Sequence, residues 1–90
     1  MIYPSQLPLI DDPSTRRQLI DTATYYRRSR GIRQVDIAAL IGVTQGTIAR
    51  WELNYDIPDE HRTNEYLWAV YNYDDLKNDY PLRKDTYDTQ

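Results

Sequence analysis

The sequence lacks cysteine and phenylalanine, and it contains only three glycines among 90 residues. Without cysteine, neither a disulfide framework nor a zinc site built on thiolates can supplement so small a core, so packing alone must hold the fold. The lack of disulfides also suits a reducing cytosol. No run approaches the roughly 18 consecutive apolar residues of a membrane span, and the N-terminus has no basic region with a long apolar segment. We therefore expect one small cytoplasmic domain.

Groups that support catalysis or cofactor binding are also scarce. His61 is the only histidine, so a His-based triad or a zinc site has little support. The pairs Asp11–Asp12 and Asp74–Asp75 could imitate paired catalytic carboxylates, but adjacent acids at a helix start more often cap the helix or face solvent. The glycines form no phosphate-binding loop. We expect no enzyme activity, no catalytic residue, no metal and no cofactor.

The net charge of −3 hides a separation of charge along the chain. Residues 15–51 contain seven arginines and two aspartates, a net charge of +5, whereas residues 52–90 carry ten carboxylates and four basic side chains, a net charge of −6. A charge run is usually a solvated face, but a basic segment is also what a polyanionic partner such as DNA requires. The seven arginines are Arg16, Arg17, Arg27, Arg28, Arg30, Arg33 and Arg50.

The apolar spacing of the first half predicts helices and no strand. A first helix should begin at Pro13, capped by Asp12, and should end near Arg30, because Gly31 can adopt positive φ. Two short helices should follow, at about 34–40 and 45–53. Gly42 would end the first of them and Thr44 would cap the second.

The second half of the chain predicts two further helices. Asn54 can take the left-handed conformation that closes the third helix. A fourth helix should start with Asp59 or Thr63 as its cap and continue to about Tyr73, and Asp74 should open a last short one. The class is therefore all-α. We expect an N-terminal arm at 1–12, a helix-turn-helix domain at 13–80 with its central unit at 34–53, and a disordered tail at 81–90.

The segment 34–52 meets the separate demands of two helices that cross over a tight turn. Ala38 is small where such helices approach each other, and Gly42 tolerates the positive φ of the turn. Val43 and Ile48 can pack the inner side of the turn and of the second helix. The residues left on the outside of the second helix are Gln45, Gly46, Thr47, Ala49 and Arg50.

These outward residues suit the reading of DNA bases, because the N-terminal part of the second helix enters the major groove when such a unit docks. Gln45 can pair with adenine N6 and N7, and Arg50 can pair with guanine O6 and N7. The methyl groups of Thr47 and Ala49 can contact a thymine methyl.

Over Gly31 to Glu52, the sequence GIRQVDIAALIGVTQGTIARWE resembles the Cro/CI-type, or XRE-like, helix-turn-helix regulators of phages, plasmids and bacterial chromosomes. The shared pattern is Gln, two residues, an aliphatic residue and Ala, three residues, Gly-Val-Thr, three residues, Ile, three residues, Glu. The resemblance implies a lambda-repressor-like bundle of about five helices whose second motif helix faces the bases. It implies a structural ion pair between Arg27 and Glu52. It also implies base contacts from Gln45, Gly46, Thr47, Ala49 and Arg50.

Phosphate contacts are expected beside these base contacts, because arginines and helix N-termini attract anions. The resemblance itself places the residue matching Gln34 on a phosphate. The expected contacts are Arg27, Arg33, Gln34, Thr44 and Asn54.

The leading hypothesis is a sequence-specific regulator of transcription that binds double-stranded DNA, such as a Cro-like protein or repressor of a phage or other mobile element. We expect a homodimer on a pseudo-palindromic operator. Residues 66–76 could form the dimer contact or belong to the internal core. The alternative is a protein-interaction module, such as an antitoxin or an antirepressor, that binds its partner through the acidic, tyrosine-rich segment 54–90.

Overall fold

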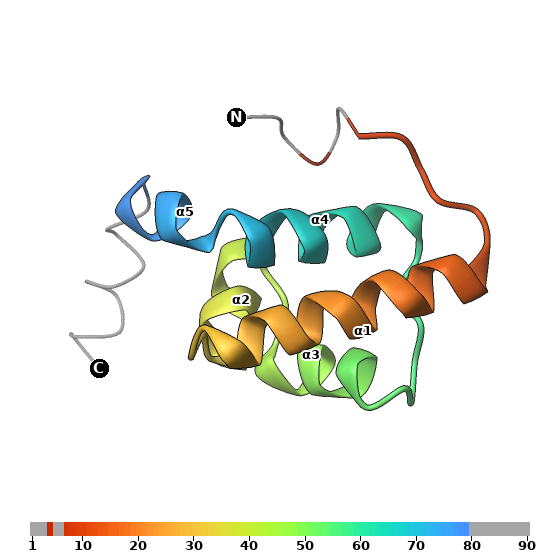
Figure 1. Ribbon diagram of the computed structural model, residues 1–90, viewed down its shortest axis with the longest axis horizontal. Coiled ribbons are helices and arrows are strands. Elements are labelled where there is room, and N and C mark those ends of the chain that lie inside the picture. Colours follow the sequence, from red (N-terminus) through yellow and green to blue (C-terminus); the bar gives the residue numbers. More distant parts are fainter. Residues whose placement is uncertain (1–3, 5–6, 80–90) are drawn as a thin grey trace.

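The computed structural model describes residue 4 and residues 7–79, and these residues form five helices and no strand (Figure 1). The predicted all-α class is confirmed. The helices are α1 (Pro13–Ser29), α2 (Gln34–Ile41), α3 (Gln45–Glu52), α4 (Glu60–Tyr71) and α5 (Tyr73–Asp79).

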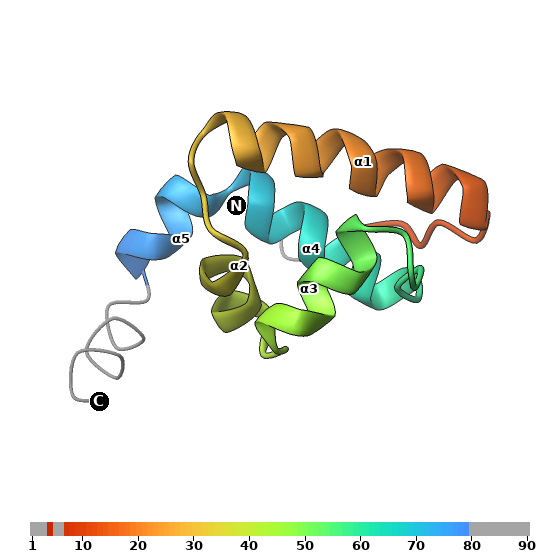
Figure 2. The ribbon, with the colours of Figure 1, turned by 90° about the horizontal axis from the view of Figure 1, so that it is seen from below.

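Four of the helices, α1 to α4, share one hydrophobic core, to which α5 adds Leu76. In Figure 2, α1 lies along the upper side of the molecule, the α2–α3 pair lies along the lower side, and α4 passes behind α3 and packs against α1 and α2. Ile20, Ile37, Ile48 and Tyr66, one from each of these helices, are fully buried at 0% exposure. Because all four helices contribute, the core holds the α2–α3 pair rigidly against α1 and α4.

Capping side chains set the helix starts. Asp12, Thr44 and Asp59 each accept a hydrogen bond from the backbone N–H three residues on, at 3.0, 3.1 and 2.8 Å. Of the two predicted caps of the fourth helix, Asp59 is therefore the one used. Thr63 is instead buried inside α4 and donates to a backbone carbonyl oxygen.

Left-handed backbone conformations close the predicted turns. Gly31, Gly42 and Asn54 have φ values of 71°, 75° and 67°. The helix ends differ from the predicted ones by one or two residues, and the largest difference is at α4, which stops at Tyr71 rather than Tyr73. The helix stops there because Asn72 takes φ −113°, outside the helical range, and α5 begins immediately afterwards.

The segment before α1 accepts hydrogen bonds from side chains of α4 and α1. Asn64 Nδ2 donates to the carbonyl oxygen of Pro8 at 3.0 Å, and Arg16 Nη1 donates to the carbonyl oxygens of Ile10 and Asp11, both at 2.8 Å. Residues 8–11 therefore lie on α4 and the start of α1. Most of residues 1–6 and the predicted tail at 81–90 lie outside the described residues, so the division into arm, domain and tail remains a prediction.

Candidate DNA-binding site

The turn between α2 and α3 is closed by backbone hydrogen bonds. The N–H groups of Gly42 and Val43 both donate to the carbonyl oxygen of Ala38, at 2.9 and 3.0 Å. Ala38 is only 2% exposed, and Ile48 of α3 is completely buried. One side of α3 is thereby fixed in the core, which leaves its other side toward solvent.

The outward side of α3 carries the residues expected to read bases. Gln45, Gly46 and Arg50 are exposed, whereas Thr47 and Ala49 are half-buried. A Cβ at Gly46 would meet only the Thr44 hydroxyl oxygen, at 3.9 Å, so the start of this surface is uncrowded.

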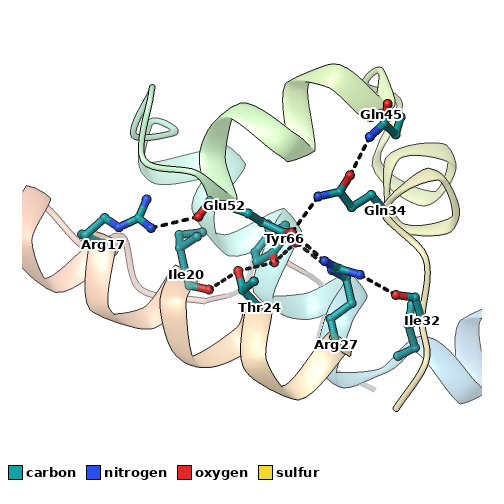
Figure 3. Close-up of polar contacts among 9 residues, drawn as sticks. All are labelled: Arg17, Ile20, Thr24, Arg27, Ile32, Gln34, Gln45, Glu52 and Tyr66. Atoms are coloured by element: carbon teal, nitrogen blue, oxygen red, sulfur yellow. Dashed lines mark hydrogen bonds and ion pairs between the residues drawn. The ribbon is translucent and has the colours of Figure 1, made fainter. Parts of the chain in front are cut away.

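Beneath this surface lies a buried ion pair between Arg27 of α1 and Glu52 of α3 (Figure 3). Arg27 Nε and Nη2 donate to the two carboxylate oxygens of Glu52 at 2.7 and 2.6 Å, and Nη1 donates to the carbonyl oxygen of Ile32 at 2.6 Å. The hydroxyl of Tyr66 donates to the same carboxylate at 2.7 Å. The bidentate contact joins α1 to α3, and the Tyr66 hydroxyl adds α4 to the same carboxylate.

The hydrogen bonds of this cluster favour an ionised Glu52 and a neutral Tyr66. Burial favours the protonated acid, but hydrogen bonds from Arg27, Tyr66 and Gln34 outweigh burial, so the pKa of Glu52 lies below its ordinary value. Burial, together with the hydrogen bond to Glu52, raises the pKa of Tyr66. The tyrosine therefore keeps its proton, and its hydroxyl donates a hydrogen bond to the carboxylate.

A chain of side-chain hydrogen bonds runs from this cluster to the outward side of α3 (Figure 3). Gln34 Nε2 donates to Glu52 Oε1 at 2.8 Å, and Gln45 Nε2 donates to Gln34 Oε1 at 2.5 Å. An ionised carboxylate only accepts hydrogen bonds, so Gln34 must turn its NH₂ inward and its oxygen outward. The orientation of the Gln45 amide follows from that of Gln34.

The expected phosphate contact of Arg27 is wrong. This side chain is only 6% exposed, and Nε, Nη1 and Nη2 all donate inside the protein. The residue that the ion pair requires therefore cannot also reach a phosphate.

Two further arginines of the basic segment donate hydrogen bonds to backbone carbonyl oxygens within the protein. Arg16 donates to backbone oxygens of the segment before α1. Arg17 donates from Nη1 and Nη2 to the carbonyl oxygens of Trp51 and Glu52, at 2.6 and 3.1 Å, which satisfies open carbonyls at the end of α3. The positive surface is thus smaller than the arginine count implies.

The other residues expected to contact phosphates lie at accessible places. Arg33 is exposed and bound to Asp36, and Asn54 is exposed at the turn after α3. The Thr44 hydroxyl caps α3 and lies 2.9 Å from the hydroxyl of Thr47. Gln34 is half-buried, and one hydrogen of its Nε2 remains beyond the bond to Glu52.

Arg50 is exposed and forms an ion pair with Asp56, with 2.6 Å between Nε and the nearer carboxylate oxygen. This hydrogen bond raises the pKa of Arg50. The motif pattern predicts Arg50 on this side of α3, whereas its partner Asp56 has no signal in the sequence.

Tyr66 and Thr24 are polar members of the site that were not predicted from the sequence. The Tyr66 hydroxyl lies 3.1 Å from the Thr24 hydroxyl and donates to Glu52, so these two residues extend the cluster across α1 and α4. In the sequence, Tyr66 belongs only to the segment 66–76, for which a dimer contact and an internal core were both open. No signal in the sequence gave the partner of its hydroxyl group.

Within residue 4 and residues 7–79, no group of three or more histidines and acidic side chains could hold a metal ion. No helix among these residues is both long enough and apolar enough to cross a membrane.

The comparisons with known proteins agree with this geometry. A family model described as helix-turn-helix matches residues 25–62, which include α2, α3 and the clustered residues Arg27 and Glu52. No curated protein and no solved structure matches the chain. Residues 25–62 therefore match the Cro/CI-type, XRE-like helix-turn-helix family, and this match supports DNA binding.

Proposed function

We propose that the protein is a sequence-specific regulator of transcription that reads double-stranded DNA with α3 in the major groove. The observation that carries this proposal is the chain of hydrogen bonds from Glu52 through Gln34 to Gln45. It holds a base-reading amide in one orientation before DNA binds, which reduces the entropy lost on binding.

The orientation of Gln45 suits adenine. Its Nε2 uses one hydrogen toward Gln34, so the second hydrogen and the Oε1 oxygen remain. Adenine offers an acceptor at N7 and a donor at N6 to such an amide. In this proposal Arg50 reads a guanine, the Thr47 and Ala49 methyls lie against a thymine methyl, and the absent side chain of Gly46 permits close approach.

The proposed backbone contacts surround these base contacts. Arg33, Gln34, Thr44 and Asn54 lie at the starts of α2 and α3 and after the end of α3. Backbone N–H groups at the two helix starts add to the attraction for phosphate.

We further propose that the protein acts in the cytoplasm as a Cro-like repressor of a phage or other mobile element. One α3 offers a small reading surface, so a homodimer on two half-sites about one helical turn apart would raise affinity and specificity. The structure leaves Leu53, Tyr55 and Ile57 exposed beside the end of α3.

A second candidate function is binding to a protein partner through residues 54–90. The exposed side chains of Tyr55, Ile57 and Tyr71 favour it, because they offer apolar contact area outside the proposed DNA surface. An antitoxin or an antirepressor of this kind could also bind DNA.

Selection of the purified full chain on a randomised duplex pool, followed by sequencing at two salt concentrations, tests the proposal. A two-fold-symmetric motif is the expected result and would support a dimeric, sequence-specific regulator. The absence of enrichment, with helix content and cooperative unfolding intact, would favour the protein-interaction function.

A further inference from the structure

Arg50 is held by a single nitrogen. Asp56 accepts the hydrogen bond from Arg50 Nε at 2.6 Å, and the two side chains are 59% and 50% exposed. Among the residues that the structure describes, neither terminal nitrogen of this guanidinium has a hydrogen-bond partner. The pair of donors that guanine O6 and N7 require therefore stays open.

The backbone fixes the place of Asp56. The N–H groups of Tyr55 and Asp56 both donate to the carbonyl oxygen of Arg50, at 2.9 and 3.3 Å. Asn54, at φ 67°, turns the chain back over the end of α3. Residues 50 and 56 are thus joined through both main chain and side chain, so the turn defines where the carboxylate lies.

The ion pair of Arg33 with Asp36 has a different geometry. Arg33 donates from both Nε and Nη2 to the two oxygens of Asp36, each at 3.0 Å. That carboxylate occupies one edge of the guanidinium fork, including a terminal nitrogen. The single contact through Nε distinguishes Arg50.

We propose that Asp56 is a specificity-determining residue, which holds Arg50 through Nε so that the terminal nitrogens are presented to a guanine. This role rests on the proposed function. An arginine that is already restrained loses less side-chain freedom when it binds. The carboxylate also repels phosphates at this place, which disfavours binding of Arg50 to the DNA backbone of any sequence.

The test measures the dissociation constants of the full chain for the selected operator, for each single base-pair variant of it and for random duplex. The proteins compared are wild type, Arg50→Ala, Asp56→Ala and Asp56→Asn. Asp21→Ala is the matched control, since Asp21 is 55% exposed, is paired with the arginine Arg17 and lies outside α3. Thermal unfolding of each variant verifies that the fold is retained.

We expect Arg50→Ala and Asp56→Ala to lose discrimination at the same G·C pair, by about tenfold. Asp56→Ala should bind random duplex as well as wild type or better, Asp56→Asn should be intermediate, and Asp21→Ala should keep its discrimination. If Asp56→Ala kept its discrimination at this G·C pair while Arg50→Ala lost it, the proposed role of Asp56 would be overturned, but the base contact of Arg50 would not. If Asp56→Ala bound all sequences more tightly by the same factor, the proposed role would also be overturned, because Asp56 would then only weaken DNA binding in general. A wild-type protein that enriches no motif would overturn the proposed function itself.

Discussion

The carboxylate of Glu52 accepts four hydrogen bonds, two from Arg27 and one each from Gln34 and Tyr66. An ionised carboxylate has about four acceptor sites, so this one is saturated. A buried group with so many partners contributes to stability and to orientation at once, and the two contributions can be measured separately.

Arg27→Ala should destabilise the fold by about 3–5 kcal/mol, because it leaves the Glu52 charge buried without its cationic partner. Arg28→Ala is the control, since Arg28 is the exposed neighbour on the same helix and should change stability by less than about 0.5 kcal/mol. Urea unfolding measures both. Similar losses in the two variants would contradict the structural role of the pair.

Stability should fall in acid through Glu52. Its pKa is lowered in the folded protein, so its contribution is present above the unfolded value of about 4.3 and is lost as pH falls through the folded pKa. Glu52→Gln cannot titrate there. The difference in free energy of unfolding between wild type and Glu52→Gln should therefore shrink from pH 7 to pH 3, and an unchanged difference would count against a lowered pKa.

Gln34→Ala should affect DNA binding in two ways. It should weaken binding to all sequences through loss of the proposed phosphate contact, and it should relax discrimination at the base pair that Gln45 is proposed to read, because the Gln45 amide loses its partner. Binding to operator variants, with Gln18→Ala on the exposed side of α1 as control, measures both effects. A uniform loss over all sequences would show that the hydrogen bond does not orient Gln45.

At the scale of the elements, α3 carries a glycine that its backbone does not need. Gly46 lies inside the helix, and an added Cβ would have only an ordinary contact at 3.9 Å. Gly46→Ala should therefore stabilise the protein by up to about 1 kcal/mol, since alanine favours a helix over glycine. Thermal unfolding measures the change.

Gly42→Ala is the informative comparison for that prediction. Gly42 has no neighbour near an added Cβ either, but its φ of 75° strains any L side chain. The substitution Gly42→Ala should therefore destabilise the protein by about 1 kcal/mol or more. If both substitutions stabilised the fold, the left-handed conformation at Gly42 would be refuted.

At the scale of the whole molecule, DNA binding should depend only moderately on salt. Arg16 and Arg17 bind backbone oxygens and Arg27 is buried, which leaves Arg28, Arg30, Arg33 and Arg50 exposed among the arginines of residues 15–51. Each neutralised phosphate changes the slope of log K against log salt by about −0.9, so a protomer should show a slope no steeper than about −4. Titrations at several salt concentrations measure it, and a slope near −6 would mean that the inward arginines also contact DNA.

The sequence by itself determined the features that depend on neighbours within about four residues. The caps Asp12 and Thr44, the left-handed positions Gly42 and Asn54, and the apolar spacing of the helices are of this kind, since local hydrogen bonds and φ preferences set them. The ion pair of Arg27 with Glu52 came only through a family resemblance.

Tertiary structure alone decided which polar groups meet. Tyr66 lies 14 residues from Glu52 and 42 from Thr24, and Arg17 lies 34 residues from the Trp51 carbonyl that it binds. The burial that removes Arg27 from the phosphate contacts likewise exists only once α1, α3 and α4 pack. Local preference cannot specify such partners, because the gain from each contact appears only when the shared core brings distant segments together and excludes water.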